Sequence, residues 1–176
     1  MKLAWGRKVS PEFRARVIAI AENIEIDPSH LMACIAFETG QTFSPSIRNK
    51  KSNATGLIQF MRTTAIGLGT TIDDLAKMDA VRQLDFVEKF FRPFKGKIHT
   101  VSDIYMVILW QRAVGKPEDY HLFEAGGAAY AQNAGLDADG DGAVTKAEAA
   151  ARIETALTRG LRPENAWDDE AGTSIV

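Results

Sequence analysis

The chain has 176 residues, about the length of one domain with a sizeable hydrophobic core. Hydrophobic residues make up 45% and charged residues 25%, as in ordinary soluble globular proteins. The net charge of -2 gives no reason to expect a nucleic-acid partner, and no apolar run is long enough to span a membrane. Cys34 is the single cysteine, which excludes an intrachain disulfide; it lies in an apolar run and is interpreted as a buried small hydrophobe.

Helical periodicity and helix start signals dominate the sequence from its beginning. Ser10-Pro11-Glu12 combines a cap, a proline in the first turn and an acid, and Asp27-Pro28 repeats the start signal. Gly40 is well placed to end the second helix. The predicted helices cover residues 11–24, 28–38, 63–68, 72–78, 80–91, 102–110, 118–134 and 145–159.

The most apolar helix, opened by Ser102-Asp103, is expected at the centre of the core. Residues 43–55 have loop composition, and no segment is a convincing strand. Beyond Pro163 the chain is polar, so residues 163–176 are expected to form an irregular tail. The sequence therefore predicts one all-α domain over residues 1–176.

Residues 137–148, D-A-D-G-D-G-A-V-T-K-A-E, fill every position of an EF-hand calcium loop. Gly142 occupies loop position six, where a sharp turn requires a positive φ. Calcium is a hard cation that takes six to eight oxygen ligands. The expected donors are the side chains of Asp137, Asp139, Asp141, Thr145 and Glu148 and the backbone carbonyl of Ala143. We expect a structural Ca²⁺; the plainer alternative is an acidic, glycine-rich turn.

Three further short segments follow one another in a meaningful order. They are Glu38-Thr39, then Gly56-Leu57-Ile58-Gln59 with Thr64-Ala65 after it, then Ala129-Tyr130 with Asn133-Ala134-Gly135. Together they resemble the lysozyme-like transglycosylase family, which includes the SLT domains and goose-type lysozymes, over about residues 28–135. The stretch through the calcium loop is similar to phage-encoded members, such as endolysins. Thr39 stands where the family usually has Ser, and two extra residues separate Tyr130 from Asn133.

The resemblance implies a lysozyme-like helical fold that cleaves the MurNAc–GlcNAc β-1,4 bond of peptidoglycan. Glu38 would be the catalytic acid, and it ends a largely apolar helix, where burial and the helix dipole both disfavour its charge. The residues implied to bind substrate or to position the acid are Thr39, Gly56, Gln59, Tyr130 and Asn133. Gly56 would let the backbone approach the glycan, and Tyr130 would place its hydroxyl near Glu38.

The reaction class stays open at this point. An inverting hydrolase needs a second carboxylate to activate water, for which Asp73 and Asp74 are the candidates. A lytic transglycosylase needs none, because the C6 hydroxyl of the sugar attacks instead. The sequence slightly favours the transglycosylase.

Two alternatives to an enzyme follow from the same motifs. One is a calcium-stabilised, lysozyme-like virion or cell-wall binding module without catalysis; the other is a calcium sensor, disfavoured because sensors usually carry paired EF-hands. The N-terminus has no apolar segment typical of a signal peptide. We therefore expect synthesis in a host cytoplasm and action in the periplasm, on the cell wall or from a virion, as a monomer.

Overall fold

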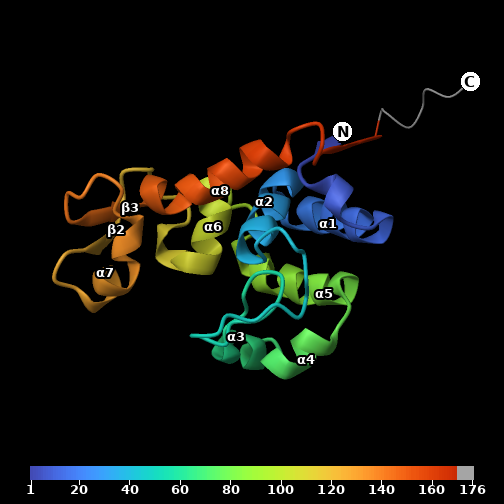
Figure 1. Cartoon of the computed structure of the whole chain (residues 1–176), viewed down its shortest axis with the longest axis horizontal. Coiled ribbons are helices and arrows are strands. Elements are labelled where there is room, and N and C mark those ends of the chain that lie inside the picture. Colours follow the sequence, from blue (N-terminus) through green and yellow to red (C-terminus); the bar gives the residue numbers. More distant parts are fainter. Residues whose placement is uncertain (170–176) are drawn as a thin grey trace, which may run out of the picture.

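The computed structural model describes residues 1–169, and this part of the chain is mostly helical (Figure 1). The helices are α1 Pro11–Ile24, α2 Pro28–Glu38, α3 Arg62–Gly67, α4 Ile72–Lys77, α5 Ala80–Phe91, α6 Val101–Leu109, α7 Ala128–Asn133 and α8 Lys146–Gly160. Short 3-10 turns lie at Gly6–Lys8, Arg92–Phe94, Gln111–Ala113 and Ala134–Leu136. The prediction of a mainly helical class is confirmed.

The start signals act as the sequence predicts. The Ser10 hydroxyl accepts a hydrogen bond from the Phe13 N–H at 3.2 Å, and the Asp27 carboxylate accepts one from Ser29 at 2.7 Å. α6 begins slightly earlier than expected, because Thr100 and Asp103 form a reciprocal capping box around its first turn. These local bonds fix where the helices begin.

Two pairs of short strands correct the expectation of a strand-free chain. β1 (Lys2–Leu3) pairs with β4 (Trp167–Asp168), and β2 (His121–Glu124) pairs with β3 (Ala143–Thr145). A helix over 118–134 was therefore wrong, since β2 occupies its first half and α7 begins only at Ala128. Gly126 turns the chain between them with φ of 89°, a conformation that favours glycine.

The predicted irregular tail is also partly wrong. Asn165 and Ala166 are buried, and the Arg14 guanidinium lies over the Trp167 ring at 5.0 Å. Pairing of β4 with β1 supplies the backbone hydrogen bonds that a polar tail would leave to water. Residues 170–176 of the predicted tail lie outside the described residues.

The core is built around α2 and α6, since Ile104, Met106 and Val107 of α6 are fully buried as well. Residues 31–36 of α2 are all fully buried, and the helix packs against α1, α6 and α8. In Figure 1, α8 runs along one edge of the molecule, while α7, β2 and β3 form a lobe at the end away from α1. Cys34 is completely buried, as predicted. No helix in residues 1–169 combines the length and the apolar character needed to cross a bilayer.

Candidate active site and metal-binding loop

Glu38 is the last residue of α2, at the edge of the core. Its side chain is half-buried, and burial raises the pKa of its carboxyl to about 7. Within residues 1–169 the carboxyl has no ion pair and no side-chain hydrogen bond. A carboxyl of this kind is protonated in part of the population at neutral pH, as a proton donor requires.

The surroundings of Glu38 are apolar. The rings of Phe37 and Tyr105 meet edge to face with their centroids 5.7 Å apart. Burial and then the charge of Glu38 raise the pKa of the Tyr105 hydroxyl, and the same two causes raise the pKa of the Cys34 thiol. Tyr105 and Cys34 are thus near neighbours of Glu38 that stay neutral and do not offset its charge.

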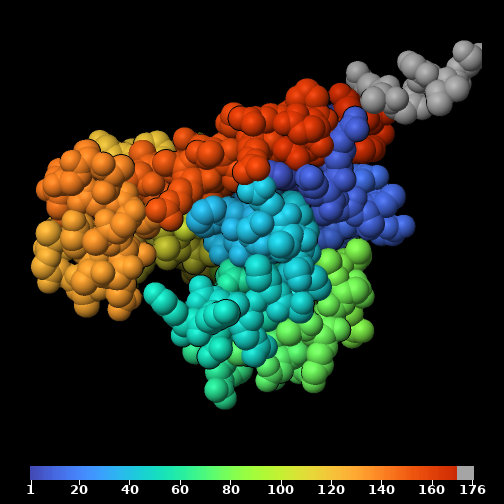
Figure 2. Space-filling view, viewed as in Figure 1, coloured from blue at the N-terminus to red at the C-terminus, as the bar shows by residue number. Residues whose placement is uncertain are grey.

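A cleft made of two adjoining cavities reaches Phe37, the residue before Glu38, but Glu38 itself lines neither cavity. One cavity of about 250 Å³ lies between α2, α6, the α7 segment and α8, and Phe37 and Tyr105 are in its lining. A second cavity of about 490 Å³, between α3, α5 and α6, shares Leu109 with the first. Figure 2 shows the hollow between the orange lobe of α7, β2 and β3 and the cyan lobe of residues 41–67. No Asp or Glu among the described residues lines either cavity.

The Thr39 side chain bonds backbone groups and does not line this cleft. Its side chain is fully buried; Oγ1 donates to the Ile35 carbonyl at 2.7 Å and accepts from the Phe43 N–H at 3.1 Å. Both hydrogen-bonding directions of the hydroxyl are used. The turn after α2 thus engages the Thr39 hydroxyl, and its predicted bond to a sugar or to the catalytic carboxyl stays a prediction.

Gly56 and Gln59 likewise shape a turn. Gly56 is buried with φ of 84°, and a Cβ there would collide with the Gln83 side chain. Gln83 in turn accepts from the Leu57 N–H at 2.7 Å, and Gln59 donates to the Gly56 carbonyl at 3.1 Å. Gly56 permits the close approach of Gln83, and its predicted contact with a glycan stays a prediction.

The third motif is divided between two sites. The Tyr130 hydroxyl donates to Asp137 Oδ2 at 2.6 Å, so it joins the acidic loop instead of meeting Glu38 as predicted. Asn133 lines the smaller cavity, while its Nδ2 donates to the Ala129 carbonyl at 2.9 Å. Of the residues expected to contact substrate, Asn133 is the one that the structure brings to the cleft wall. Tyr105, whose ring contacts Phe37, is the tyrosine whose pKa is raised in part by the charge of Glu38.

Asp73 and Asp74 have structural partners. Asp73 bonds Arg48 at 2.7 Å, which lowers the pKa of its carboxyl, and Asp74 accepts from the Thr71 hydroxyl at 2.8 Å. Both lie in the first turn of α4, where carboxylates are favoured by the helix dipole. Neither lines the cleft.

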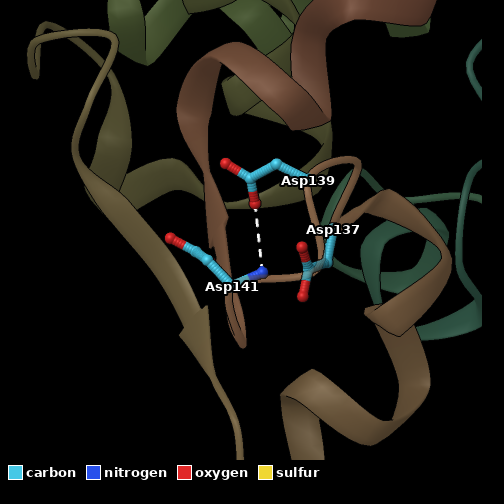
Figure 3. Close-up of side chains that lie close together, drawn as sticks. All are labelled: Asp137, Asp139 and Asp141. Carbon is cyan, nitrogen blue, oxygen red and sulfur yellow. Dashed lines mark hydrogen bonds between the residues drawn. The ribbon is translucent and has the colours of Figure 1, made fainter.

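The acidic loop gathers its carboxylates as the sequence predicts. Oxygen atoms of Asp137, Asp139 and Asp141 lie within 4.8 Å of one another, and this group can hold a metal ion. Figure 3 shows the three side chains, with Asp139 accepting from the Asp141 N–H at 3.1 Å. Gly142 has φ of 90°, the positive value expected at this position.

Thr145 and Glu148 close the loop. Thr145 caps α8 in a capping box with Glu148, and Glu148 Oε1 accepts from the Ala138 N–H at 2.9 Å, at the start of the loop. The Tyr130 hydroxyl lowers the pKa of Asp137, and the Thr145 N–H lowers that of Glu148. Both carboxylates are therefore ionised at neutral pH. Ala143 begins β3, which pairs with β2 rather than with a second calcium loop.

One buried ion pair was not foreseen. Lys146 Nζ lies 2.7 Å from Asp103 Oδ1, and both side chains are at most 3% exposed. Asp103 also accepts from the N–H groups of His99, Thr100 and Gly115. The pair ties the end of the acidic loop to the start of α6. In the sequence, Lys146 looks like an exposed residue of a first helical turn, so only three-dimensional packing identifies it.

No protein-family model matches the chain, and no curated protein matches it either.

Proposed function

We propose that this protein cleaves the MurNAc–GlcNAc β-1,4 bond of peptidoglycan with Glu38 as general acid. The observation that carries the proposal is the half-buried Glu38 carboxyl, without a counter-ion, whose pKa burial raises to about 7. It ends a buried helix and follows Phe37, which lines the cleft. The order of the three sequence motifs supports the same class and a lysozyme-like fold.

In this proposal the protonated Glu38 gives its proton to the glycosidic oxygen as the bond breaks. The resulting carboxylate then accepts a proton from the attacking hydroxyl, which restores the acid. Asp73 and Asp74 are engaged by Arg48 and Thr71, and no Asp or Glu of residues 1–169 lines the cleft itself. This arrangement favours attack by the sugar's own C6 hydroxyl, the lytic transglycosylase reaction, over attack by a water molecule that needs a second carboxylate.

We also propose that the acidic loop binds Ca²⁺. Asp137, Asp139, Asp141 and Glu148 would supply carboxylate oxygens, with Thr145 and the Ala143 carbonyl completing the set. The donor chemistry fits, because all of these are oxygen ligands and the three Asp oxygens already converge. A bound ion would offset the mutual repulsion of the carboxylates. Through Tyr130 and Asp137 the loop also holds α7, which forms one wall of the cleft.

The non-catalytic cell-wall binding module remains a second candidate. It is favoured by the internal hydrogen bonds of Thr39, Gly56, Gln59 and Tyr130, which leave few of the motif side chains facing a substrate. Pairing of β3 with β2 makes the calcium sensor the weakest of the three, since the loop already has its strand partner.

The direct test is release of soluble fragments from purified peptidoglycan sacculi in the presence of calcium. Wild-type protein is expected to release them, and Glu38→Gln to be at least a hundredfold slower, the lower end of the effect of losing a general acid. Glu22→Gln, an exposed glutamate on α1, is the matched control and is expected to match wild type. Equal rates for Glu38→Gln and wild type would reject Glu38 as the acid. An inactive wild-type protein that still sediments with sacculi would support the binding module. In the organism, such an enzyme would serve phage-mediated lysis from inside the cell or entry through the cell wall.

A further inference from the structure

The short helix α3 exposes two large apolar side chains to solvent. Met61, the residue before its first turn, is 49% exposed, and Ile66 is 59% exposed. Met1 is the only other large apolar side chain of residues 1–169 with comparable exposure. Ala65 is fully buried and packs the inner face of α3 against the core. The helix lies at the edge of the molecule opposite α8 (Figure 1), and nothing in residues 1–169 covers its outer face.

A cation lies beside these two side chains. Arg62 follows Met61 directly and precedes Ile66 by four residues, so helical spacing makes it a neighbour of both. The Arg62 side chain is exposed and has no ion pair in residues 1–169. Its charge is therefore available to an anionic group outside the chain.

Two lysines lie at the same end of this lobe. Thr55 pairs with Arg48 on one side and with Phe60 on the other, both antiparallel. In this register, the turn after Arg48 and the start of α3 after Phe60 lie at the same end of the paired segments. Lys50 and Lys51 occupy that turn and are exposed. We define the α3 patch as Lys50, Lys51, Met61, Arg62 and Ile66.

Positive charge is concentrated in the part of the chain that carries the α3 patch. Residues 39–72 include four basic residues and no Asp or Glu, a charge of +4 in a chain whose net charge is -2. The first acids beyond this segment are Asp73, which bonds Arg48 at 2.7 Å, and Asp74, which accepts from Thr71 at 2.8 Å. Since Arg48 and Asp73 offset each other, the three cations of the α3 patch carry the excess charge.

The mixture of apolar and cationic side chains decides between two kinds of anionic partner. A soluble polyanion needs the cations only, because its contacts are ionic. At a bilayer, apolar side chains enter the interface while Lys and Arg meet the lipid phosphates. Met61 and Ile66 therefore favour a lipid surface.

We propose that the α3 patch docks this protein onto bilayers that contain anionic phospholipids. The attachment is peripheral and reversible, since no helix of residues 1–169 can span a bilayer and only two apolar side chains enter it. The patch shares no residue with the lining of the cleft, so the inference does not depend on the proposed function.

The test is co-sedimentation of the full chain with sucrose-loaded vesicles at low ionic strength and fixed calcium. One set of vesicles is phosphatidylcholine alone, and the other contains equal parts of phosphatidylcholine and phosphatidylglycerol. Because three cations meet the surface, we expect about tenfold or stronger binding to the anionic vesicles, which weakens as salt is added.

Two variants of the patch separate its contributions. Met61→Ser combined with Ile66→Ser should weaken binding to the anionic vesicles by about fivefold or more, because the apolar insertion is lost. Lys50→Gln, Lys51→Gln and Arg62→Gln together should remove the preference for anionic lipid. All five positions are exposed, and melting temperatures equal to that of the wild type would show that the variants fold.

The matched control removes the same charge from exposed cations outside the segment, with Lys8→Gln, Lys97→Gln and Arg162→Gln in one chain. It is expected to bind both kinds of vesicle as the wild type does. Equal sedimentation of the wild type with both kinds of vesicle, or equal binding by the two triple variants, would overturn the inference. Full binding by the double serine variant would also overturn it, because the patch would then suit a soluble polyanion.

A fluorophore at position 61 reports the contact directly. Cys34 does not interfere with labelling, because it is fully buried. Met61→Cys carrying an environment-sensitive fluorophore should shift its emission to shorter wavelength with the anionic vesicles only. The same fluorophore on Glu22→Cys, an exposed position on α1, should show no shift. A shift at position 22 without one at position 61 would place the lipid contact elsewhere and reject the α3 patch.

Discussion

The Tyr130 hydroxyl lies 2.6 Å from Asp137 Oδ2, so the motif expected at the active site is bonded to the first residue of the acidic loop. Tyr130 belongs to α7, and the chain just after it lines the cleft. The state of the loop therefore bears on the shape of the cleft wall. If the proposed function is correct, this hydrogen bond would couple metal binding at the loop to substrate binding in the cleft.

Removal of calcium is expected to destabilise the protein. At free calcium about a hundred times its dissociation constant, a site adds about 2.7 kcal/mol, which corresponds to a rise of about 5–10 °C in Tm for a chain of this size. Differential scanning calorimetry with EDTA and with calcium measures the change. The Tm of Asp137→Ala should not change with calcium. A wild-type Tm that is the same with EDTA and with calcium would contradict the calcium assignment.

The free energy of unfolding should fall as the pH rises from 4.5 to about 7, the unfolded and native pKa values of Glu38. The native pKa of about 7 lies above the 4.5 of a free glutamate, so between these values the unfolded chain releases a proton that the native state keeps. At about 1.4 kcal/mol per pKa unit, the cost of the ionised form reaches about 3 kcal/mol above pH 8. Glu38→Gln should therefore be more stable than wild type by up to that amount at pH 8, and nearly equal at pH 4, in urea denaturation. Equal stabilities at both pH values would argue against a buried carboxyl.

The rate of catalysis should fall at pH values above the pKa of Glu38. Only protonated Glu38 can donate, and its population falls tenfold per pH unit above a pKa of about 7. Initial rates of sacculus solubilisation from pH 6 to pH 9, at fixed ionic strength and calcium, are expected to decline along that curve. A rate that stays constant to pH 9 would show that another group delivers the proton.

The buried pair of Lys146 and Asp103 should be sensitive to the loss of either partner. Lys146→Met leaves the Asp103 carboxylate buried with backbone donors only, and removal of one partner of such a pair typically costs about 3–5 kcal/mol. Asp103→Asn in the same chain should restore part of the loss, because the uncompensated charge is then gone. Chemical denaturation of both single variants and the double variant measures the coupling; additive losses would mean that the pair is not coupled.

Two substitutions at Thr39 distinguish a structural role of its hydroxyl from a role in binding substrate. Thr39→Val keeps the shape but leaves the buried Phe43 N–H without its acceptor, a loss of about 1–3 kcal/mol. Thr39→Ser keeps the hydroxyl and should be close to wild type in stability. If Thr39→Val were as stable as wild type but much slower on sacculi, the hydroxyl would belong to the substrate after all.

The parts of the molecule that the sequence predicts well depend on local chemistry. The caps at Ser10 and Asp27, the half-buried Glu38 at the end of an apolar helix and the loop of Asp137, Asp139 and Asp141 all use neighbours a few residues away. Predictions from local sequence failed where the structure depends on contacts between distant segments. The strand β2 forms because β3 lies beside it, and a glycine is needed at position 56 because Gln83 packs onto it. The position of Tyr105 beside Glu38 depends on how α6 packs against α2, which no short motif records.

The products released from purified peptidoglycan test the central claim most directly. Mass spectrometry of the soluble fragments should find 1,6-anhydro-muramyl ends from wild-type protein with calcium and none from Glu38→Gln. Such ends are the signature of intramolecular attack by the C6 hydroxyl with Glu38 as the acid. Reducing muramic acid ends would contradict the transglycosylase assignment, and the absence of any glycan cleavage by wild-type protein would contradict the enzyme itself.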